Sequence, residues 1–165
     1  MPATRADLMN RFQQLGISTE TRDHPPVHTV EQAQSLRGSI PGGHCKNLFL
    51  KDEKGVLWLI VCLEDADINL KAAPAKIGSK RLSFGKPDLL MEVLGVEPGS
   101  VTPFGLINDT GARANVILDE PMMRHQQLNY HPLRNDATTT IAADDLLAFI
   151  RSCGHAPRIV AVSGA

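Results

Sequence analysis

Aromatic residues are scarce in this sequence, and its positive and negative charges nearly balance. Only 4% of the 165 residues are aromatic, which argues against single-stranded nucleic acid binding on a stacking platform. Lysine and arginine number 17 against 18 aspartates and glutamates, so the formal net charge is -1. A chain with this balance has no general attraction to nucleic acid, and DNA is not an expected partner. A nucleic-acid partner would have to be held by a local basic patch.

Cysteine motifs and long apolar runs are also lacking. The three cysteines, Cys45, Cys62 and Cys153, are widely spaced and form no C-x-x-C motif, so neither a disulfide framework nor a cysteine zinc site is suggested. No apolar run approaches the roughly 20 residues of a membrane helix, so no membrane partner is expected. The stretch 1–16 is polar and contains acids, unlike a signal peptide, and the expected location is the cytoplasm.

Helices and strands are present without repeats, low-complexity tracts or linkers, which predicts a single domain over residues 1–165. Two strands joined by Glu53-Lys54-Gly55 predict a hairpin, and the second is apolar on both faces, which is typical of a central strand. Strand pairs mixed with separate helices indicate an α+β domain on a mixed or mostly antiparallel sheet. The expected helices are 4–16, 29–38, 67–78, 86–95 and 143–154, and the expected strands are 17–24, 45–52, 56–63, 81–85, 114–119, 128–133, 138–143 and 158–163.

One lysine stands where a glycine loop meets an expected core strand. In "SIPGGHCKNLFLKD", Gly42 and Gly43 give the backbone conformational freedom, and Lys46 and Asn47 then precede an apolar pair. The ordinary interpretation is a strand-end lysine whose alkyl chain lies on the core while its ammonium reaches water. The functional interpretation is an ammonium beside a desolvated pocket, where it can orient a carbonyl or phosphate or act as a base.

A second pattern, Gly99-x-x-x-Pro103, occurs in the loop "EPGSVTPFG". Glycine lets a backbone approach a ligand closely, and the two prolines of the loop stiffen it. The backbone N–H groups of Ser100, Val101 and Thr102 are expected to point inward and bind an oxyanion, a carbonyl or a water. The alternative is an ordinary irregular connection.

Histidines near the lysine raise the question of zinc. His24, His28 and His44 lie close in sequence with Cys45 adjacent, but the prolines at 25–26 prevent a shared helical face. No H-E-x-x-H motif and no suitably spaced acid is present, so neither a metal nor a cofactor is expected. The sequence has no G-x-S-x-G motif to support a Ser-His-Asp triad. Cys45 is more typical of a buried strand cysteine than of a nucleophile.

A positive excess occurs in the stretch 71–86, which contains no acid. Its basic residues are either a solvated helix face or a contact with a phosphate backbone. They are Lys71, Lys76, Lys80, Arg81 and Lys86.

Three segments together resemble the YbaK/prolyl-tRNA editing superfamily, and within it most closely the stand-alone alanyl-tRNA(Pro) deacylases of the ProX/PrdX type. They are "HPPVHTVEQAQSLRGSIPGGHCKNLFLKD", "EPGSVTPFGLINDTG" and "LNYHPLRNDATTTI". The resemblance spans nearly the whole chain and implies an α+β fold in which helices surround a twisted mixed sheet.

The resemblance also implies an activity: metal-independent hydrolysis, in trans, of the ester in alanine-mischarged tRNA(Pro). Lys46 matches the family's essential lysine and Asn47 its polar neighbour, while Gly99 to Pro103 match the loop that positions the ester or its water. His131 matches a pocket-side position. The implied partners are tRNA(Pro) charged with alanine and, transiently, prolyl-tRNA synthetase.

Alternatives stay open within this resemblance. Related members prefer cysteinyl-tRNA(Pro), and only pocket volume separates two substrates that differ by one sulfur. The base can be Lys46, a bound water or the 2′-hydroxyl of the substrate. A catalytically silent module that binds tRNA through the stretch 71–86 is the alternative from another functional class, and a zinc hydrolase is the weakest one.

Overall fold

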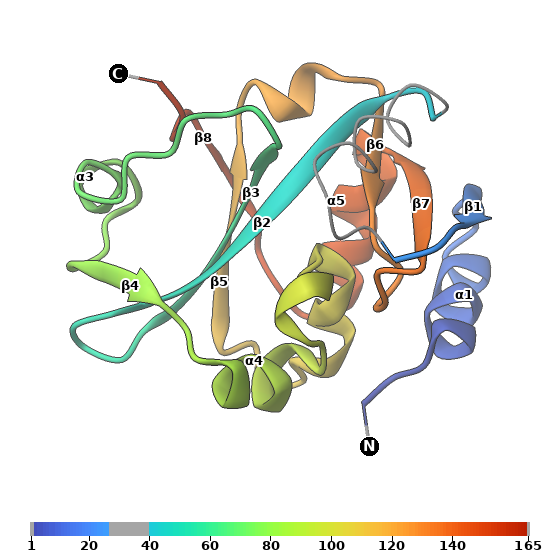
Figure 1. The fold of residues 1–165 in the computed structure, drawn as a ribbon, viewed down its shortest axis with the longest axis horizontal. Coiled ribbons are helices and arrows are strands. Elements are labelled where there is room, and N and C mark those ends of the chain that lie inside the picture. Colours follow the sequence, from blue (N-terminus) through green and yellow to red (C-terminus); the bar gives the residue numbers. More distant parts are fainter. Residues whose placement is uncertain (1, 27–39, 165) are drawn as a thin grey trace.

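The segment that is apolar on both faces lies inside a mixed sheet, as its sequence predicts. It forms β3 (Leu57–Leu63), in which residues 57–62 are buried. The computed structural model describes residues 2–26 and 40–164, and their strands form one eight-stranded sheet in the order β1-β7-β6-β2-β3-β5-β8, with β4 paired to β2 (Figure 1). The other strands are β1 (Thr19–Asp23), β2 (Gly43–Asp52), β4 (Leu82–Phe84), β5 (Ala114–Asp119), β6 (Gln127–Tyr130), β7 (Ala137–Ala142) and β8 (Arg158–Val160).

The direction of the strands makes the sheet mixed. Antiparallel pairing joins β1 to β7, β6 to β7, β2 to β3 and β2 to β4, whereas β2–β6, β3–β5 and β5–β8 are parallel. The expected α+β class and the hairpin between the segments 45–52 and 56–63 are thus confirmed.

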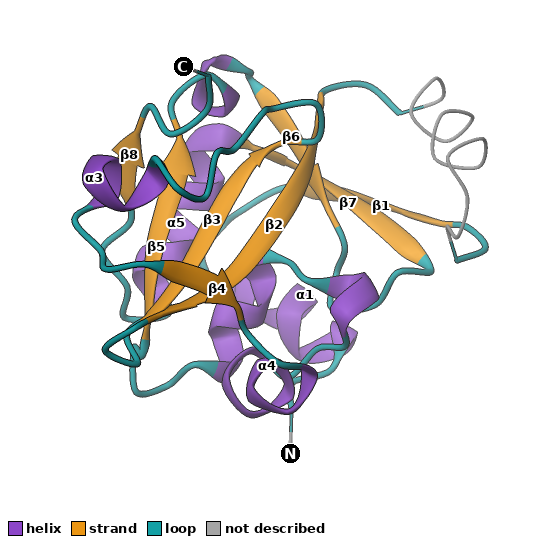
Figure 2. Cartoon of the chain, turned by 60° about the vertical axis from the view of Figure 1, so that its left-hand side comes forward, coloured by secondary structure: helices purple, strands orange, loops and turns teal. Residues whose placement is uncertain are grey.

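The two faces of β3 are buried against different helices (Figure 2). Leu59 and Val61 pack in the larger core with α1 (Arg5–Gln14), α4 (Pro87–Leu94) and α5 (Ala143–Ser152). Trp58 and Ile60 point the other way because side chains alternate along a strand, and they pack with α3 (Ala73–Ile77). No helix in the described residues is long and apolar enough to cross a membrane.

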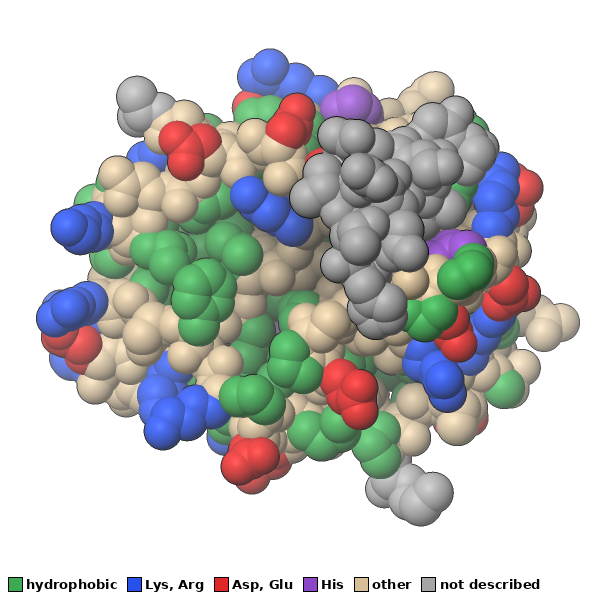
Figure 3. All heavy atoms as spheres, viewed as in Figure 1, with side chains coloured by type: hydrophobic (Ala, Val, Ile, Leu, Met, Phe, Trp, Pro, Cys, Tyr) green, Lys and Arg blue, Asp and Glu red, His purple; other side chains and the backbone are tan. Residues whose placement is uncertain are grey.

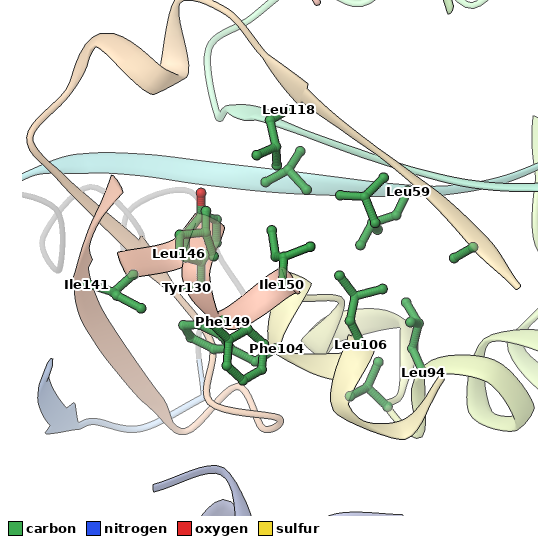
Figure 4. Close-up of a cluster of buried hydrophobic side chains, with 14 of the residues drawn as sticks. Leu59, Leu94, Phe104, Leu106, Leu118, Tyr130, Ile141, Leu146, Phe149 and Ile150 are labelled. Atoms are coloured by element: carbon green, nitrogen blue, oxygen red, sulfur yellow. The ribbon is translucent and has the colours of Figure 1, made fainter. Parts of the chain in front are cut away.

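The larger core is centred on aromatic rings that fix the end of the Gly99 loop (Figure 4). Phe104 is fully buried, and its ring lies 5.2 Å from that of Phe12, 5.4 Å from that of Phe149 and 5.7 Å from that of Tyr130, measured between centroids. Edge-to-face aromatic pairs add about 0.5–1.5 kcal/mol each beyond their area burial. These contacts hold the chain immediately after Pro103.

Some boundaries differ from those expected. The helix expected over 67–78 covers only Ala73–Ile77, because Asn69 Oδ1 accepts hydrogen bonds from the N–H groups of Lys71 and Ala72 and holds a turn before it. The strand expected over 128–133 ends at Tyr130, ahead of a turn. The loop 96–111 contains two 3₁₀ helices, η1 (Pro98–Ser100) and η2 (Pro103–Asn108). The helix expected over 29–38 lies outside the described residues.

Candidate active site

Lys46 is held in place on the face of β2 that packs toward α3. It pairs with Cys62 of β3, and its Nζ donates a hydrogen bond to the carbonyl oxygen of Ala66, 2.6 Å away. The side chain is half-buried. An ammonium has three N–H donors, and no other described residue accepts one from Lys46. Two donors therefore remain for a ligand.

Asn47 lies on the opposite face of β2, because side chains alternate along a strand. Its Nδ2 donates to the carbonyl oxygen of Val101, 3.1 Å away, and so joins the strand to the Gly99 loop. Its Oδ1 is buried and accepts no hydrogen bond from a described residue. The structure thus brings Asn47 to the loop, while Lys46 approaches from the other face.

The edge of β2 between these two faces is left unpaired at residues 45–49 by the described strands, and we refer to it as the open edge of β2. β6 pairs with β2 only at Gly43 and His44, and β4 pairs with it only from Leu50 onward. The carbonyl of Phe49 points to this edge, since it accepts from the N–H of Gly85. By the two-residue repeat of a strand, the backbone N–H and C=O of Asn47 point the same way. Among the described strands none covers 45–49 here, so an extended ligand has backbone groups to bind.

The Gly99 loop supplies fewer free donors than its sequence predicts. The N–H of Ser100 is not free, because it donates to the carbonyl of Glu97 within the turn of η1. The N–H groups of Val101 and Thr102 have no acceptor among the described residues. The Thr102 side chain is used too, since its Oγ1 accepts from the N–H of Phe104, 3.2 Å away, and starts η2.

Gly99 is exposed and lies beside the β6–β7 turn. A Cβ added there would meet only the Nδ2 of Asn135, at 3.6 Å, which is ordinary contact. A side chain at this position is therefore compatible with the fold. The glycine leaves open a backbone surface that a ligand can approach.

His131 opens the same turn, directly after β6. Its Nδ1 lies 3.0 Å from the carbonyl oxygen of Ala137, so in the neutral ring Nδ1 carries the proton and Nε2 is the acceptor. Burial lowers the pKa of His131, the hydrogen bond to Ala137 opposes this, and the charge of His24 lowers it further. The ring is therefore held neutral at pH 7.

The thiols are poor nucleophiles. Burial raises the pKa of Cys45 to about 12 and that of Cys62 to about 11. At neutral pH almost none of either is thiolate, which is the reactive form. In the described residues no group of three or more His, Cys, Asp and Glu side chains is arranged to hold a metal ion. His28 of the proposed zinc set lies outside them.

The basic stretch divides into one engaged and four exposed residues. The Nζ of Lys76 donates to the carbonyls of Val162 at 2.9 Å and Gly164 at 3.4 Å, which ties α3 to the C-terminal segment. No ion pair joins any of the five to another described residue. The exposed residues are Lys71, Lys80, Arg81 and Lys86.

Comparison with known proteins identifies the family. Residues 24–149 match the family described as "Aminoacyl-tRNA editing domain". The chain belongs to this family. It is an aminoacyl-tRNA hydrolase of the editing class, and the resemblance of the sequence is confirmed.

Relatives share most of the length of the chain. "Prolyl-tRNA synthetase associated domain-containing protein 1" of Bos taurus is 37% identical over 161 residues, covering 94% of each chain. "Prolyl-tRNA editing protein ProX" of Acetoanaerobium sticklandii is 34% identical, covering 88% of this chain and 89% of its own. A solved structure provisionally described as a trans-editing enzyme for prolyl tRNA synthetase has a TM-score of 0.72 at 20% identity, covering 97% of this chain and 98% of its own, and so shares the fold.

Two contacts within the candidate site carry no sequence signal. Lys46 donates to the main-chain carbonyl of Ala66, and any residue type at position 66 would supply that carbonyl, so the sequence does not indicate the bond. Asn135 lies beside Gly99 only because the β6–β7 turn folds back onto η1. Neither contact could be found from motif spacing.

Proposed function

We propose that the chain hydrolyses alanine from mischarged tRNA(Pro), acting in trans on an error of prolyl-tRNA synthetase. The observation that carries the proposal is the open edge of β2 between the held ammonium of Lys46 and the Asn47–Val101 hydrogen bond. Membership of the editing family and the names of the relatives support tRNA(Pro) as the substrate.

In this proposal the residues on the two faces of β2 bind different parts of the substrate. The Lys46 ammonium binds the phosphate or ribose of the terminal nucleotide. The Oδ1 of Asn47, buried and without a described donor, accepts from the α-ammonium of the amino acid. The ester then lies at the strand edge, next to the loop.

Hydrolysis adds water across the ester. The water oxygen attacks the carbonyl carbon, negative charge develops on the carbonyl oxygen, and the 3′-oxygen of the tRNA leaves with a proton. In this proposal the N–H groups of Val101 and Thr102, which have no acceptor among the described residues, stabilise that charge as in an oxyanion hole. The half-buried Val101 makes the direct contact, because Thr102 has no exposed surface. The hydrogen bond to Asn47 fixes the peptide between these two residues, since that peptide carries the Val101 carbonyl.

In this proposal the site selects small amino acids because a rigid loop forms one wall of the pocket. One extra methylene is worth only about 1–3 kcal/mol in a loose pocket, so sparing correctly charged Pro-tRNA(Pro) requires steric exclusion. The loop is stiffened by Pro98 and Pro103 and anchored by the buried Phe104. We further propose a transient contact with prolyl-tRNA synthetase, and a cytoplasmic location where tRNA is charged.

The decisive test is incubation with Ala-, Cys- and Pro-tRNA(Pro) and measurement of the amino acid released. We expect Ala-tRNA(Pro) to be cleaved fastest, with activity retained in EDTA. Lys46→Ala should abolish turnover, while Lys54→Ala, a change of an exposed hairpin lysine, should not. Survival of all three esters would disprove the proposal, and faster release of cysteine would assign the chain to the cysteine-specific relatives.

A further inference from the structure

Phe84 is the most exposed of the large hydrophobic side chains in the described residues, at 62%. It ends β4, an edge strand that pairs only with β2 among the described strands. Leu50, its partner across the pair, is fully buried in the smaller core, whereas most of the Phe84 ring faces solvent. An aromatic ring left exposed at a sheet edge is available to a partner.

Phe84 and Lys46 lie on the same face of the sheet. Phe84 is directly opposite Leu50, so both side chains point to one face, and Lys46 lies four residues before Leu50 on β2. At about 3.3 Å per residue the two positions are about 13 Å apart along the strand. That span is roughly four steps between stacked nucleotides, at about 3.4 Å per step.

This face of the sheet carries partly exposed apolar side chains. Leu48, Ile68 and Leu70 are partly buried and pack on the smaller core beneath this face. Figure 3 shows hydrophobic side chains gathered on the half of the molecule that carries α3 and β4, with lysine and arginine side chains on several sides. A ligand that offered only polar backbone groups would not bind well to such a surface. Unpaired bases would, because their flat faces are apolar.

The charges next to Phe84 favour a polyanion. Arg81 and Lys86 flank β4 and are exposed without an ion pair to a described residue. The nearby carboxylate of Asp52 is buried under the hairpin and accepts hydrogen bonds from several N–H groups, so it does not face a ligand. A base stacked on Phe84 would therefore have cations available for its phosphates.

We propose that Phe84 stacks against a base in the unpaired 3′ end of the tRNA, which runs from Lys46 along the apolar surface to β4. The inference rests on the proposed function, since it takes the terminal nucleotide to be at Lys46. Low aromatic content argues against a platform of several rings, and this site uses one. Single-stranded nucleic acid is commonly held by such stacking within a positively charged surface.

The test measures binding of uncharged tRNA(Pro) and of the same tRNA lacking its unpaired 3′ nucleotides. Phe84→Ala should weaken binding of the intact tRNA about fivefold to thirtyfold and leave the trimmed tRNA unaffected. Phe84→Trp should retain binding. Ile159→Ala, which truncates a side chain 49% exposed on β8, is the matched control and should change neither.

Other results would overturn the inference. Equal weakening of both tRNAs, or no weakening of either, would exclude contact with the 3′ end, and a thermal melt of Phe84→Ala would show whether the fold is intact. Unchanged tRNA binding with lost retention on immobilised prolyl-tRNA synthetase would assign Phe84 to a protein interface instead. If the wild type binds tRNA as expected but releases no alanine, the proposed function fails and the stacking site stands.

Discussion

The side-chain amide of Asn47 and the carbonyl of Val101, 54 residues apart in the sequence, are joined by a hydrogen bond of 3.1 Å. This bond connects a central strand to the loop that carries the free N–H groups of the site. Because the strand is rigid and the loop is irregular, Asn47 determines where those N–H groups point. We therefore propose that Asn47 positions the loop as well as binding the substrate.

Replacing Asn47 with alanine should lower kcat/KM for Ala-tRNA(Pro) by about twofold to twelvefold, because one hydrogen bond is worth about 0.5–1.5 kcal/mol. Asn115→Ala is the matched control, since Asn115 Nδ2 makes the same kind of bond, to the Leu57 carbonyl at 3.0 Å. We expect both variants to lose similar stability in urea and only Asn47→Ala to lose activity. Equal activity in the two would remove Asn47 from the site.

Gly99→Ala should reduce alanine hydrolysis by about tenfold or more while leaving the melting temperature unchanged. The fold has room for the added methyl group, whose nearest neighbour is Asn135 Nδ2 at 3.6 Å, so a loss would come from blocked approach of the ester. Gly111→Ala is the control, because its Cβ would lie 3.8 Å from Arg113 in a similarly open loop. An active Gly99→Ala enzyme would show that the ester does not contact this part of the loop.

Cys45→Ala should keep kcat within about twofold, and iodoacetamide at pH 8 should not inactivate the wild type through this residue. Burial raises the pKa of the Cys45 thiol to about 12, so thiolate is scarce at that pH. Mass spectrometry of the treated protein checks for alkylation. Rapid labelling of Cys45 with loss of activity would restore it as a candidate nucleophile.

The local elements could be predicted because their signals are local. The turn at Glu53–Gly55 and the doubly apolar segment after it specify the β2–β3 hairpin and its central place in the sheet. The sequence motif, however, treats Lys46 and Asn47 as one unit, whereas strand alternation places them on opposite faces. Which face receives the Gly99 loop depends on packing against α1, α4 and α5, and no local pattern specifies that.

The remaining differences come from hydrogen bonds that the sequence pattern does not show, one local and one tertiary. The sequence predicts a free N–H at Ser100, but the local turn of η1 uses it for the Glu97 carbonyl. Lys76 was grouped with the exposed basic residues, yet it reaches carbonyl groups at Val162 and Gly164, 86 and 88 residues away. Both outcomes depend on how the backbone folds around the residue, which composition and spacing do not report.

Asp52 should make stability depend on pH in the acid range. Burial acts to raise its pKa, but the N–H groups of Val56, Lys80 and Lys54 and the indole of Trp58 outweigh it, so the pKa is lowered. A lowered pKa contributes stability that is full above the unfolded value of about 3.9 and is lost as pH falls through the folded pKa.

Asp52→Asn should therefore cost about 1–3 kcal/mol of unfolding free energy at pH 7 and flatten the acid limb of the stability curve. Urea titrations from pH 7 to about pH 2 measure both effects. Asp65→Asn, at an exposed position in the turn after β3, is the control and should do neither. A variant as stable as the wild type at pH 7 would contradict the assignment.

Reversing the charge of Lys80 and Arg81 together should raise KM for Ala-tRNA(Pro), leave kcat nearly unchanged and reduce the salt dependence of binding. Each contact with a phosphate contributes about one unit to the salt slope on a duplex, so two lost contacts should lower it by about two. Arg151→Glu on α5 is the control for a charge reversal elsewhere on the surface, and it should leave the slope unchanged. Lys76→Met should behave differently, because its ammonium is held by the C-terminal carbonyls: it should lower the melting temperature with little change in KM. An unaltered KM and slope in the double reversal would return Lys80 and Arg81 to the solvated surface and leave docking of the acceptor stem to other residues.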